Sequence, residues 1–192
     1  MHNTFKIYYF IDEFNRQEIQ KLNINIALIY RNYAKNNNSK LIKKIKDFCF
    51  KQKREFYLSN NIKLALKLDL DGVYIPSFNQ LCCYKNIRSK KNFKILGSAH
   101  NLSQLKNKEN QGCESIFIAP LFKTKKNNYF LDIVRFNLIS NNSKNKIIAL
   151  GGINKYNYKK LKLTKSNGLA SISWIKKNRP KNLGRFLNNL KY

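Results

Sequence analysis

The chain has 192 residues, of which 43% are hydrophobic and 13% aromatic, so one domain spanning residues 1–192 can bury a core of ordinary size. Its 38 Lys and Arg residues against 10 Asp and Glu residues give a net charge of +28, which attracts anions. The lysines are spread along the whole chain among many Asn and Ile residues, a composition typical of codon bias toward A and T. We therefore do not expect nucleic-acid binding as the main function.

The pattern of apolar residues and cysteines excludes several other classes of protein. No apolar run approaches the roughly 18 residues of a membrane span, and residues 1–14 lack the basic segment and cleavage site of a signal peptide. We expect a soluble cytoplasmic protein with no membrane partner. CxxC spacing and His/Cys clusters are missing, so we expect reduced, mostly buried thiols at Cys49, Cys82, Cys83 and Cys113.

Short apolar segments alternate with longer amphipathic ones, as in βα units around a parallel sheet. Eight strands are predicted: Lys6–Ile11, Ile24–Tyr30, Phe56–Leu58, Gly72–Ile75, Lys94–Ser98, Ser115–Ile118, Lys146–Leu150 and Gly168–Ser171. Eight parallel strands close a barrel. An open doubly wound sheet usually has a glycine-rich turn after its first strand, and residues 12–15 contain no glycine. We therefore predict an α/β fold, a single (β/α)₈ TIM barrel.

Apolar residues at helical spacing predict helices between the strands. One buried stripe comprises Leu41, Ile42, Ile45, Phe48 and Cys49, with lysines facing outward. A shorter stripe comprises Ile133, Phe136, Leu138 and Ile139. A last helix that covers the barrel beside the first one is expected from Leu183, Phe186, Leu187 and Leu190.

Two glycines follow the predicted strand Lys146–Leu150. Gly151 and Gly152 can bring backbone N–H groups against an anion, because no Cβ stands in the way. In a barrel the neighbouring strand end is Ser171–Ser173, and two adjacent strand ends with N–H groups and a hydroxyl form the usual phosphate site of this fold. The sequence thus indicates a phosphate site at this edge, with plain turns as the alternative.

Two further strand ends carry groups that suit a phosphorylated ligand. Thr124 and Lys125 lie in the segment after Ser115–Ile118, where a hydroxyl and an ammonium can close over a phosphate. The alternative is a solvated lysine run. His100 follows the strand Lys94–Ser98 and can transfer protons near neutral pH, although a hydrogen-bonded structural histidine is equally compatible with this position.

These residues belong to a series of segments that resembles the motifs of one known superfamily. In the same order and over nearly the whole chain, the thiamine-phosphate synthase/TenI-like superfamily has motifs similar to Ile29–Tyr33, Leu64–Pro76, Gly97–His100, Ala119–Thr124, Ala149–Ile153 and Gly168–Ser173. The resemblance implies a barrel of thiamine biosynthesis. Its members couple a pyrimidine pyrophosphate to a thiazole phosphate, or isomerise a thiazole carboxylate phosphate with a histidine at the position of His100.

The resemblance also implies the roles of individual residues. Gly151, Gly152, Ile172 and Ser173 would hold the phosphate, and Thr124 and Lys125 would close over it. Ser98 would contact the substrate, and Arg31 would be a second anion contact. The family's Gln and Lys on either side of that arginine are replaced here by Ile29 and Tyr33.

The metal positions depart from the family's pattern. The synthases hold Mg²⁺ with two aspartates, and this chain has Asn60 and Asn79 there, which are poor ligands for a hard divalent cation. We therefore expect no cofactor and no need for Mg²⁺. The chain is closer to the TenI-like branch, which lacks much of the pyrophosphate apparatus.

Three functional hypotheses follow. The first is an enzyme of thiamine-thiazole metabolism, a synthase or a thiazole tautomerase, acting on a small phosphorylated thiazole. The second is a non-catalytic phosphometabolite-binding or regulatory barrel, and the third is a basic RNA-associated protein, for which there is charge but no recognition motif. A homo-oligomer is compatible with each hypothesis. Under the first, Gly152→Asp is expected to abolish phosphate binding with little loss of folding.

Overall fold

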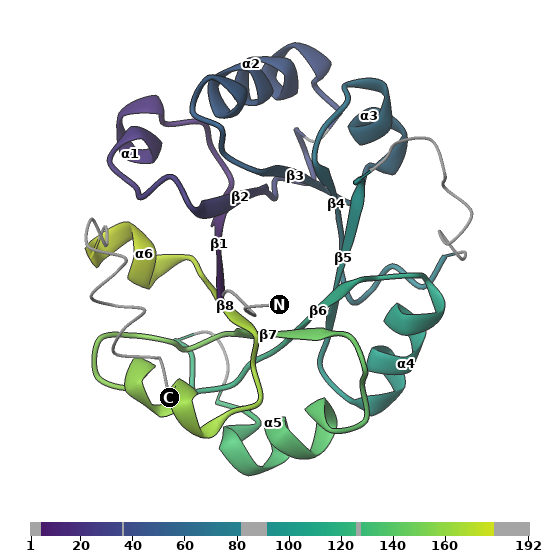
Figure 1. The fold of residues 1–192 in the computed structure, drawn as a ribbon, viewed down its shortest axis with the longest axis vertical. Coiled ribbons are helices and arrows are strands. Elements are labelled where there is room, and N and C mark those ends of the chain that lie inside the picture. The colour runs from purple at the N-terminus through teal and green to yellow at the C-terminus, as the bar shows by residue number, and fades with distance from the viewer. Residues whose placement is uncertain (1–4, 36, 82–91, 126–127, 179–192) are drawn as a thin grey trace.

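The computed structural model describes residues 5–35, 37–81, 92–125 and 128–178, and it is a closed barrel of parallel strands (Figure 1). The strands are β1 (Lys6–Ile11), β2 (Ile26–Tyr30), β3 (Phe56–Ser59), β4 (Gly72–Ile75), β5 (Lys94–Ala99), β6 (Ser115–Ile118), β7 (Lys146–Leu150) and β8 (Gly168–Ser171). Each strand pairs with the next, and β8 pairs with β1 from Gly168 opposite Lys6 to Ser171 opposite Tyr9. The predicted (β/α)₈ barrel is confirmed.

Helices form an outer ring around the strands in the described ranges (Figure 1). They are α1 (Arg16–Gln20), α2 (Ser39–Lys51), α3 (Ile62–Lys67), α4 (Leu102–Asn110), α5 (Asp132–Ser140), α6 (Ser173–Asn178) and the 3₁₀ helix η1 (Tyr158–Leu163). Asparagines cap four of these helices, because their side-chain oxygens accept a hydrogen bond from an N–H of the first turn. In the described part of the chain, no helix is long and apolar enough to cross a membrane.

The second strand begins two residues later than predicted. The segment before it is a turn in which the Ile26 N–H donates to the Asn23 carbonyl at 3.1 Å, and Ile24 is 48% exposed. The hydrophobic character of Ile24 therefore does not place it in the strand. Two other predicted strands, β3 and β5, continue for one more residue, to Ser59 and Ala99.

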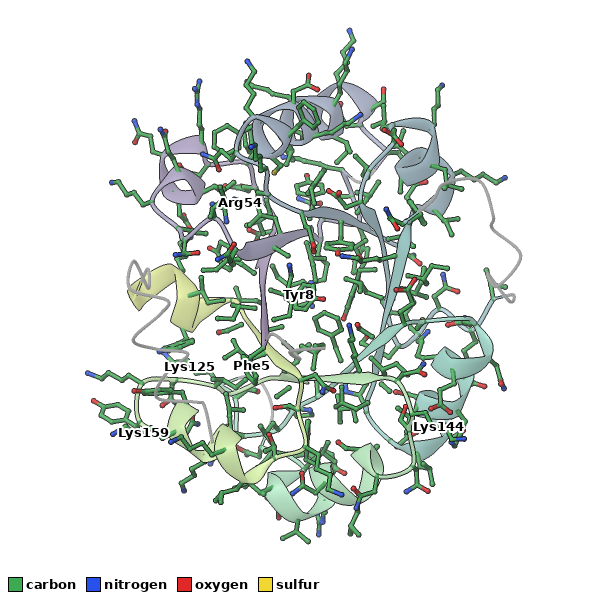
Figure 2. All side chains as sticks on the ribbon, in the orientation of Figure 1. Phe5, Tyr8, Arg54, Lys125, Lys144 and Lys159 are labelled. Atoms are coloured by element: carbon green, nitrogen blue, oxygen red, sulfur yellow. The ribbon has the colours of Figure 1, made fainter. Side chains whose placement is uncertain are left out.

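The barrel interior is filled by side chains rather than open. The inward-facing residues are Tyr8, Phe10, Ala27, Ile29, Tyr57, Tyr74, Leu96, Phe117, Ile148 and Ala170. Their aromatic rings pack edge to face: the ring centroids of Tyr8 and Phe117 are 4.9 Å apart and those of Tyr74 and Phe117 are 5.3 Å apart. Tyr8 lies near the barrel axis in Figure 2.

The two predicted helical stripes behave differently. In α2, Ile42, Ile45 and Cys49 are buried, as the spacing predicts. In α5, Phe136 is buried but Leu138 is 60% exposed, so its assignment to the buried stripe is wrong. Positions two apart lie on different faces of a helix, and Phe136 takes the inner one.

Cys49 and Cys113 are buried free thiols, as expected. Cys82, Cys83 and the predicted helix at 183–190 lie outside the described residues.

One carboxylate joins the beginnings of several strands at the amino-terminal end of the barrel. Glu55 lies next to the ammonium groups of Lys6, at 3.1 Å, and Lys94, at 3.0 Å. It also accepts a hydrogen bond from the Tyr57 hydroxyl at 2.7 Å. Burial alone would raise the pKa of this carboxyl, but the neighbouring cations and the phenol outweigh burial and lower it to about 2.

Candidate functional site

The carboxyl ends of the strands meet at one face of the barrel, which we call the mouth. Arg31 follows β2, Asn60 follows β3, His100 follows β5 and Gly151 follows β7. The parallel topology therefore brings the sequence-predicted residues to the same end of the molecule. Ser98 lies just inside the mouth, where it is 5% exposed and its hydroxyl is hydrogen-bonded to the side chain of Tyr74.

Arg31 places a positive charge over the aromatic floor of the mouth. Its guanidinium carbon lies 4.6 Å from the centroid of the Phe10 ring, a cation–π arrangement. In the described ranges no carboxylate lies within ion-pair distance of Arg31, so no described carboxylate neutralises its charge. Burial raises the pKa of the neighbouring Tyr74 to about 12, although the Ser98 hydroxyl and the Arg31 charge act in the opposite direction. The mouth is thus a cationic site above a neutral phenol.

One hydrogen bond orients the ring of His100, and a second one holds its backbone. Its ring Nδ1 lies 2.7 Å from the carbonyl oxygen of Ala119, and its backbone N–H donates to Oε1 of Gln104 at 2.8 Å. A carbonyl can accept but not donate, so Nδ1 carries the proton and a neutral ring keeps its lone pair on Nε2. The side chain is exposed at the mouth. This geometry suits a proton acceptor, and it also anchors the end of β6.

The close approach of the segment after β6 explains both glycines of the predicted phosphate site. Gly151 has φ +94° and Gly152 has φ +69°, and a Cβ on Gly152 would lie 2.3 Å from the carbonyl oxygen of Phe122. The Phe122 N–H donates to the Gly151 carbonyl at 3.1 Å. Gly152→Asp would therefore disturb the backbone, and the expectation that it leaves folding intact is wrong.

The two strand ends of the predicted phosphate site are neighbours. Leu150 of β7 lies opposite Ala170 of β8, so Gly151 and Ile172 follow adjacent strands. Within the described chain no acceptor is found for the backbone N–H groups of Gly151, Gly152 and Ile172. The Ser171 hydroxyl accepts from the Trp174 N–H at 3.3 Å, at the beginning of α6. Ser173 begins α6, and its side chain lies outside the described atoms.

The predicted closing residues follow the segment that packs on Gly152. The backbone of Phe122 and Lys123 is packed against Gly152, and Thr124 and Lys125 follow. Thr124 is half-buried and Lys125 is exposed. Figure 2 places Lys125 near the edge of the molecule, well to the side of Tyr8. Their role over a bound phosphate stays a prediction.

Asn60 and Asn79 contact each other directly. The Asn79 amide donates to Oδ1 of Asn60 at 2.6 Å, and Oδ1 of Asn79 accepts from the Leu81 N–H at 2.9 Å. Both side chains are neutral, and the described residues contain no group of three His, Cys, Asp or Glu side chains that could hold a metal ion. These residues therefore do not fit the magnesium ion implied by the resemblance, because they supply no negative charge to balance it.

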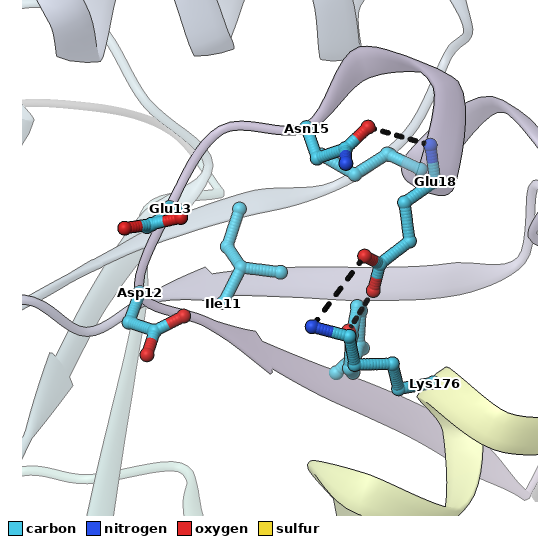
Figure 3. Close-up of a pocket in the computed structure, with 8 residues that line it drawn as sticks. Ile11, Asp12, Glu13, Asn15, Glu18 and Lys176 are labelled. Atoms are coloured by element: carbon cyan, nitrogen blue, oxygen red, sulfur yellow. Dashed lines mark hydrogen bonds and ion pairs between the residues drawn. The ribbon is translucent and has the colours of Figure 1, made fainter.

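A separate cavity of about 80 Å³ lies outside β1, where Asp12, Glu13 and Glu18 gather (Figure 3). Glu18 accepts a hydrogen bond from the Tyr9 hydroxyl and lies 3.7 Å from the ammonium of Lys176. The acidic lining makes this cavity unsuitable for a phosphate. Its ion pair instead connects α1 with α6, the helix that follows β8.

Two residues of the mouth were not predicted from the sequence as site residues. Phe10 supports Arg31, and Tyr74 is hydrogen-bonded to Ser98. Successive side chains of a strand alternate between its two sides, and Val73 and Ile75 pack on the outer side. This alternation could have indicated that Tyr74 points into the barrel.

The fold and the mouth define a (β/α)₈ barrel with an anion-attracting site at its strand ends. The family model described as thiamine monophosphate synthase matches residues 19–175, and the chain belongs to this family. The thiamine-phosphate synthase of Pelagibacter ubique is 35% identical over 149 residues, which are 74% of this chain and 71% of that protein. A thiamine-phosphate synthase of Prochlorococcus marinus is 32% identical over 142 residues, 69% of this chain. This alignment spans 39% of the Prochlorococcus protein.

Solved structures show the same fold. The thiamine phosphate pyrophosphorylase of Pyrococcus furiosus superposes with a TM-score of 0.78 at 20% identity, covering 98% of this chain and 96% of that one. The 3-hexulose-6-phosphate synthase of Salmonella typhimurium gives 0.69 at 16% identity, covering 96% and 97% of the two chains. The family model and the curated relatives confirm the predicted superfamily, and the solved structures confirm its fold, while the roles of the individual residues stay predictions.

Proposed function

We propose that this chain is an enzyme of thiamine biosynthesis that binds a thiazole phosphate in the mouth and isomerises the thiazole. The observation that carries the proposal is the 2.6 Å contact between Asn60 and Asn79, where the resemblance implies two magnesium carboxylates. Coupling to a pyrimidine pyrophosphate requires charge compensation that two amides do not supply. Binding one phosphate requires a cation and N–H donors. Arg31 would supply the first, and the N–H groups of Gly151 and Gly152, which have no acceptor within the described chain, would supply the second.

His100 would transfer the proton. Its Nε2 would take a proton from one position of a thiazole carboxylate phosphate, and a proton returned at a second position would complete the isomerisation. Atoms and electrons balance without an oxidant, a metal or a cofactor. The Ala119 carbonyl, 2.7 Å from Nδ1, would orient the ring and stabilise the imidazolium while it exists.

A non-catalytic phosphometabolite-binding or regulatory barrel is the second candidate. The observations that favour it are structural: the packing of Phe122 against Gly152 explains the glycines, and the anchoring of His100 to Ala119 explains the histidine. Under this candidate the ligand still binds at the mouth. Only turnover separates the two candidates.

Arg31→Gln tests the site, with Arg16→Gln as the matched control. Both arginines stack on a phenylalanine, Arg31 on Phe10 in the mouth and Arg16 on Phe48 outside the barrel, at 4.6 and 5.6 Å. Calorimetry with thiazole phosphate should show binding about tenfold weaker or more for Arg31→Gln, because a charge-assisted contact is lost. Arg16→Gln should bind like the parent.

Three outcomes would revise the proposal. Equal affinity for thiazole phosphate in Arg31→Gln and the parent would show that the ligand does not bind in the mouth. Vigorous Mg²⁺-dependent formation of thiamine phosphate from the two phosphorylated substrates would restore the synthase assignment. Normal binding without isomerisation would favour the non-catalytic barrel.

A further inference from the structure

One lysine of α4 is buried, although most of the described lysines are exposed. Lys108 is 1% exposed, and it passes so close to β5 that a Cβ on Gly97 would lie 2.9 Å from its Cδ (Figure 1). Its ammonium donates to the carbonyl oxygen of Asn79 at 2.6 Å and to Oε1 of Gln111 at 2.8 Å. Among the described residues this ammonium has no carboxylate partner, and burial lowers its pKa.

Gln111 holds the same loop, which follows β4. It is 4% exposed, and its Nε2 donates to the carbonyl oxygens of Asn79 at 3.0 Å and Leu81 at 2.9 Å. Taking an ammonium out of water costs free energy, which hydrogen bonds to neutral carbonyls offset only in part. The loop geometry that the two side chains fix therefore explains the buried lysine better than a gain in stability does. We call Lys108 and Gln111 the α4 clamp.

The α4 clamp holds the backbone of Asn79, and the side chain of Asn79 holds Asn60. The Asn79 amide donates to Oδ1 of Asn60 at 2.6 Å, and the Asn60 N–H donates to the Tyr74 carbonyl at 2.8 Å. Asn60 is partly exposed, and its Nδ2 has no acceptor in the part of the chain that the structure describes. A hydrogen-bond donor is therefore available at the end of β3.

The order of the strands places this donor across the mouth from the proposed phosphate site. Gly151 and Gly152 follow β7, and β3 is four strands away from β7 in either direction around the closed ring of eight. A ligand that contacts both sides needs a second acceptor opposite its phosphate. The carboxylate of a thiazole carboxylate phosphate is such a group, since an amide N–H can donate to it.

We propose that the α4 clamp positions Asn60 to donate its amide N–H to the carboxylate of this ligand. Lys108 and Gln111 act through Asn79, so they are positioning residues, and Asn60 makes the contact. The inference rests on the proposed function and deepens it, because it names the group that the mouth recognises opposite the phosphate. The parent should therefore bind the carboxylated ligand more tightly than thiazole phosphate without the carboxylate.

Calorimetry on the full chain with these two ligands tests the clamp, and Lys106→Met is the matched control for Lys108→Met. Lys106 lies on the same helix, with its side chain 52% exposed. Lys108→Met should bind the carboxylated ligand about tenfold more weakly than the parent, because a hydrogen bond to a charged group is lost, and should bind thiazole phosphate equally well. Lys106→Met should bind both ligands like the parent.

Two further variants keep the test independent of the folding of Lys108→Met. Gln111→Met removes two of the three bonds from the clamp to the loop and should lower the same affinity several-fold. Asn60→Gly removes the contact itself at φ +59°, which glycine adopts without strain, and should weaken binding of the carboxylated ligand about tenfold. In the Asn60→Gly background, Lys108→Met should have no further effect on this affinity.

The outcomes separate this inference from the proposed function. Equal losses for the two ligands in Lys108→Met and Gln111→Met would show a clamp that is only structural. A parent without preference for the carboxylated ligand, an unchanged affinity in Asn60→Gly, or an equal loss in Lys106→Met would also overturn the inference and leave the proposed phosphate site in place. A parent that binds neither ligand would overturn both.

Discussion

His100 serves both the fold and the proposed reaction through different atoms of one ring. Nδ1 donates to the Ala119 carbonyl at 2.7 Å, and Nε2 would accept the proton in the proposed reaction. An asparagine amide can replace the Nδ1–H donor but cannot accept a proton near neutral pH. His100→Asn therefore separates the two roles.

We expect His100→Asn to lower isomerisation by a factor of roughly 10² to 10⁴, with the affinity for thiazole phosphate almost unchanged. The melting temperature should stay close to that of the parent, because the bond to Ala119 is kept. Steady-state kinetics with calorimetry and thermal unfolding measure the three quantities. A parent that turns over and a variant equally active would make His100 purely structural.

At the scale of elements, the barrel is tied together where its strands begin. Glu55 lies beside Lys6 of β1 and Lys94 of β5. Its pKa is lowered to about 2, so the folded state holds this carboxylate ionised more strongly than the unfolded chain does. The stability that it contributes is present above about pH 4.5 and is lost as the pH falls toward 2.

Glu55→Gln should therefore remove this pH dependence. At pH 7 the free energy of unfolding should fall by about 2 to 3 kcal/mol, an upper range because the side chain is 28% exposed. The parent and the variant should converge as the pH approaches 2, as measured by urea unfolding at a series of pH values. As a control, Glu109→Gln removes the single ion pair with Lys106, whose side chain is 52% exposed, and should change stability by less than about 1 kcal/mol. Parallel pH profiles for the parent and Glu55→Gln would contradict the assignment.

The elements were predictable because fully buried parallel strands are short apolar runs between turns. Lys6–Ile11 and Lys146–Leu150 have the predicted bounds for this reason. The beginning of β2 was predicted too early because an apolar residue in a turn, Ile24, cannot be distinguished in the sequence from the first residue of a strand. The burial of Leu138 was predicted wrongly because the short apolar stripe contained positions from two faces of α5.

The site was predictable only as a set of strand ends. Once the barrel is inferred, Arg31, His100 and Gly151 must lie at one face. The contact of Asn60 with Asn79 and the packing of Phe122 on Gly152 depend on how loops fold over that face. Such contacts join residues far apart in the chain, and no local pattern encodes them.

At the scale of the whole molecule, the charge of +28 should destabilise the folded chain by self-repulsion. Ion pairs such as Lys106 with Glu109, at 2.9 Å, use few of the 38 cations. The melting temperature should therefore rise by a few degrees, roughly 2 to 4 °C for each kcal/mol, between low salt and about 0.5 M NaCl. Differential scanning calorimetry at several NaCl concentrations measures the rise, and a melting temperature that falls with salt would contradict it.

The pairing of β1 with β8 also has a consequence for the synthesis of the chain on the ribosome. Lys6 pairs with Gly168, and the two are 168 − 6 = 162 residues apart. At typical rates of synthesis, β1 waits roughly ten seconds or more for that partner to be made. During this time one edge of β1 has no strand beside it, and such an edge is prone to pair with other chains. The growing polypeptide is therefore expected to need a chaperone until the last strand emerges.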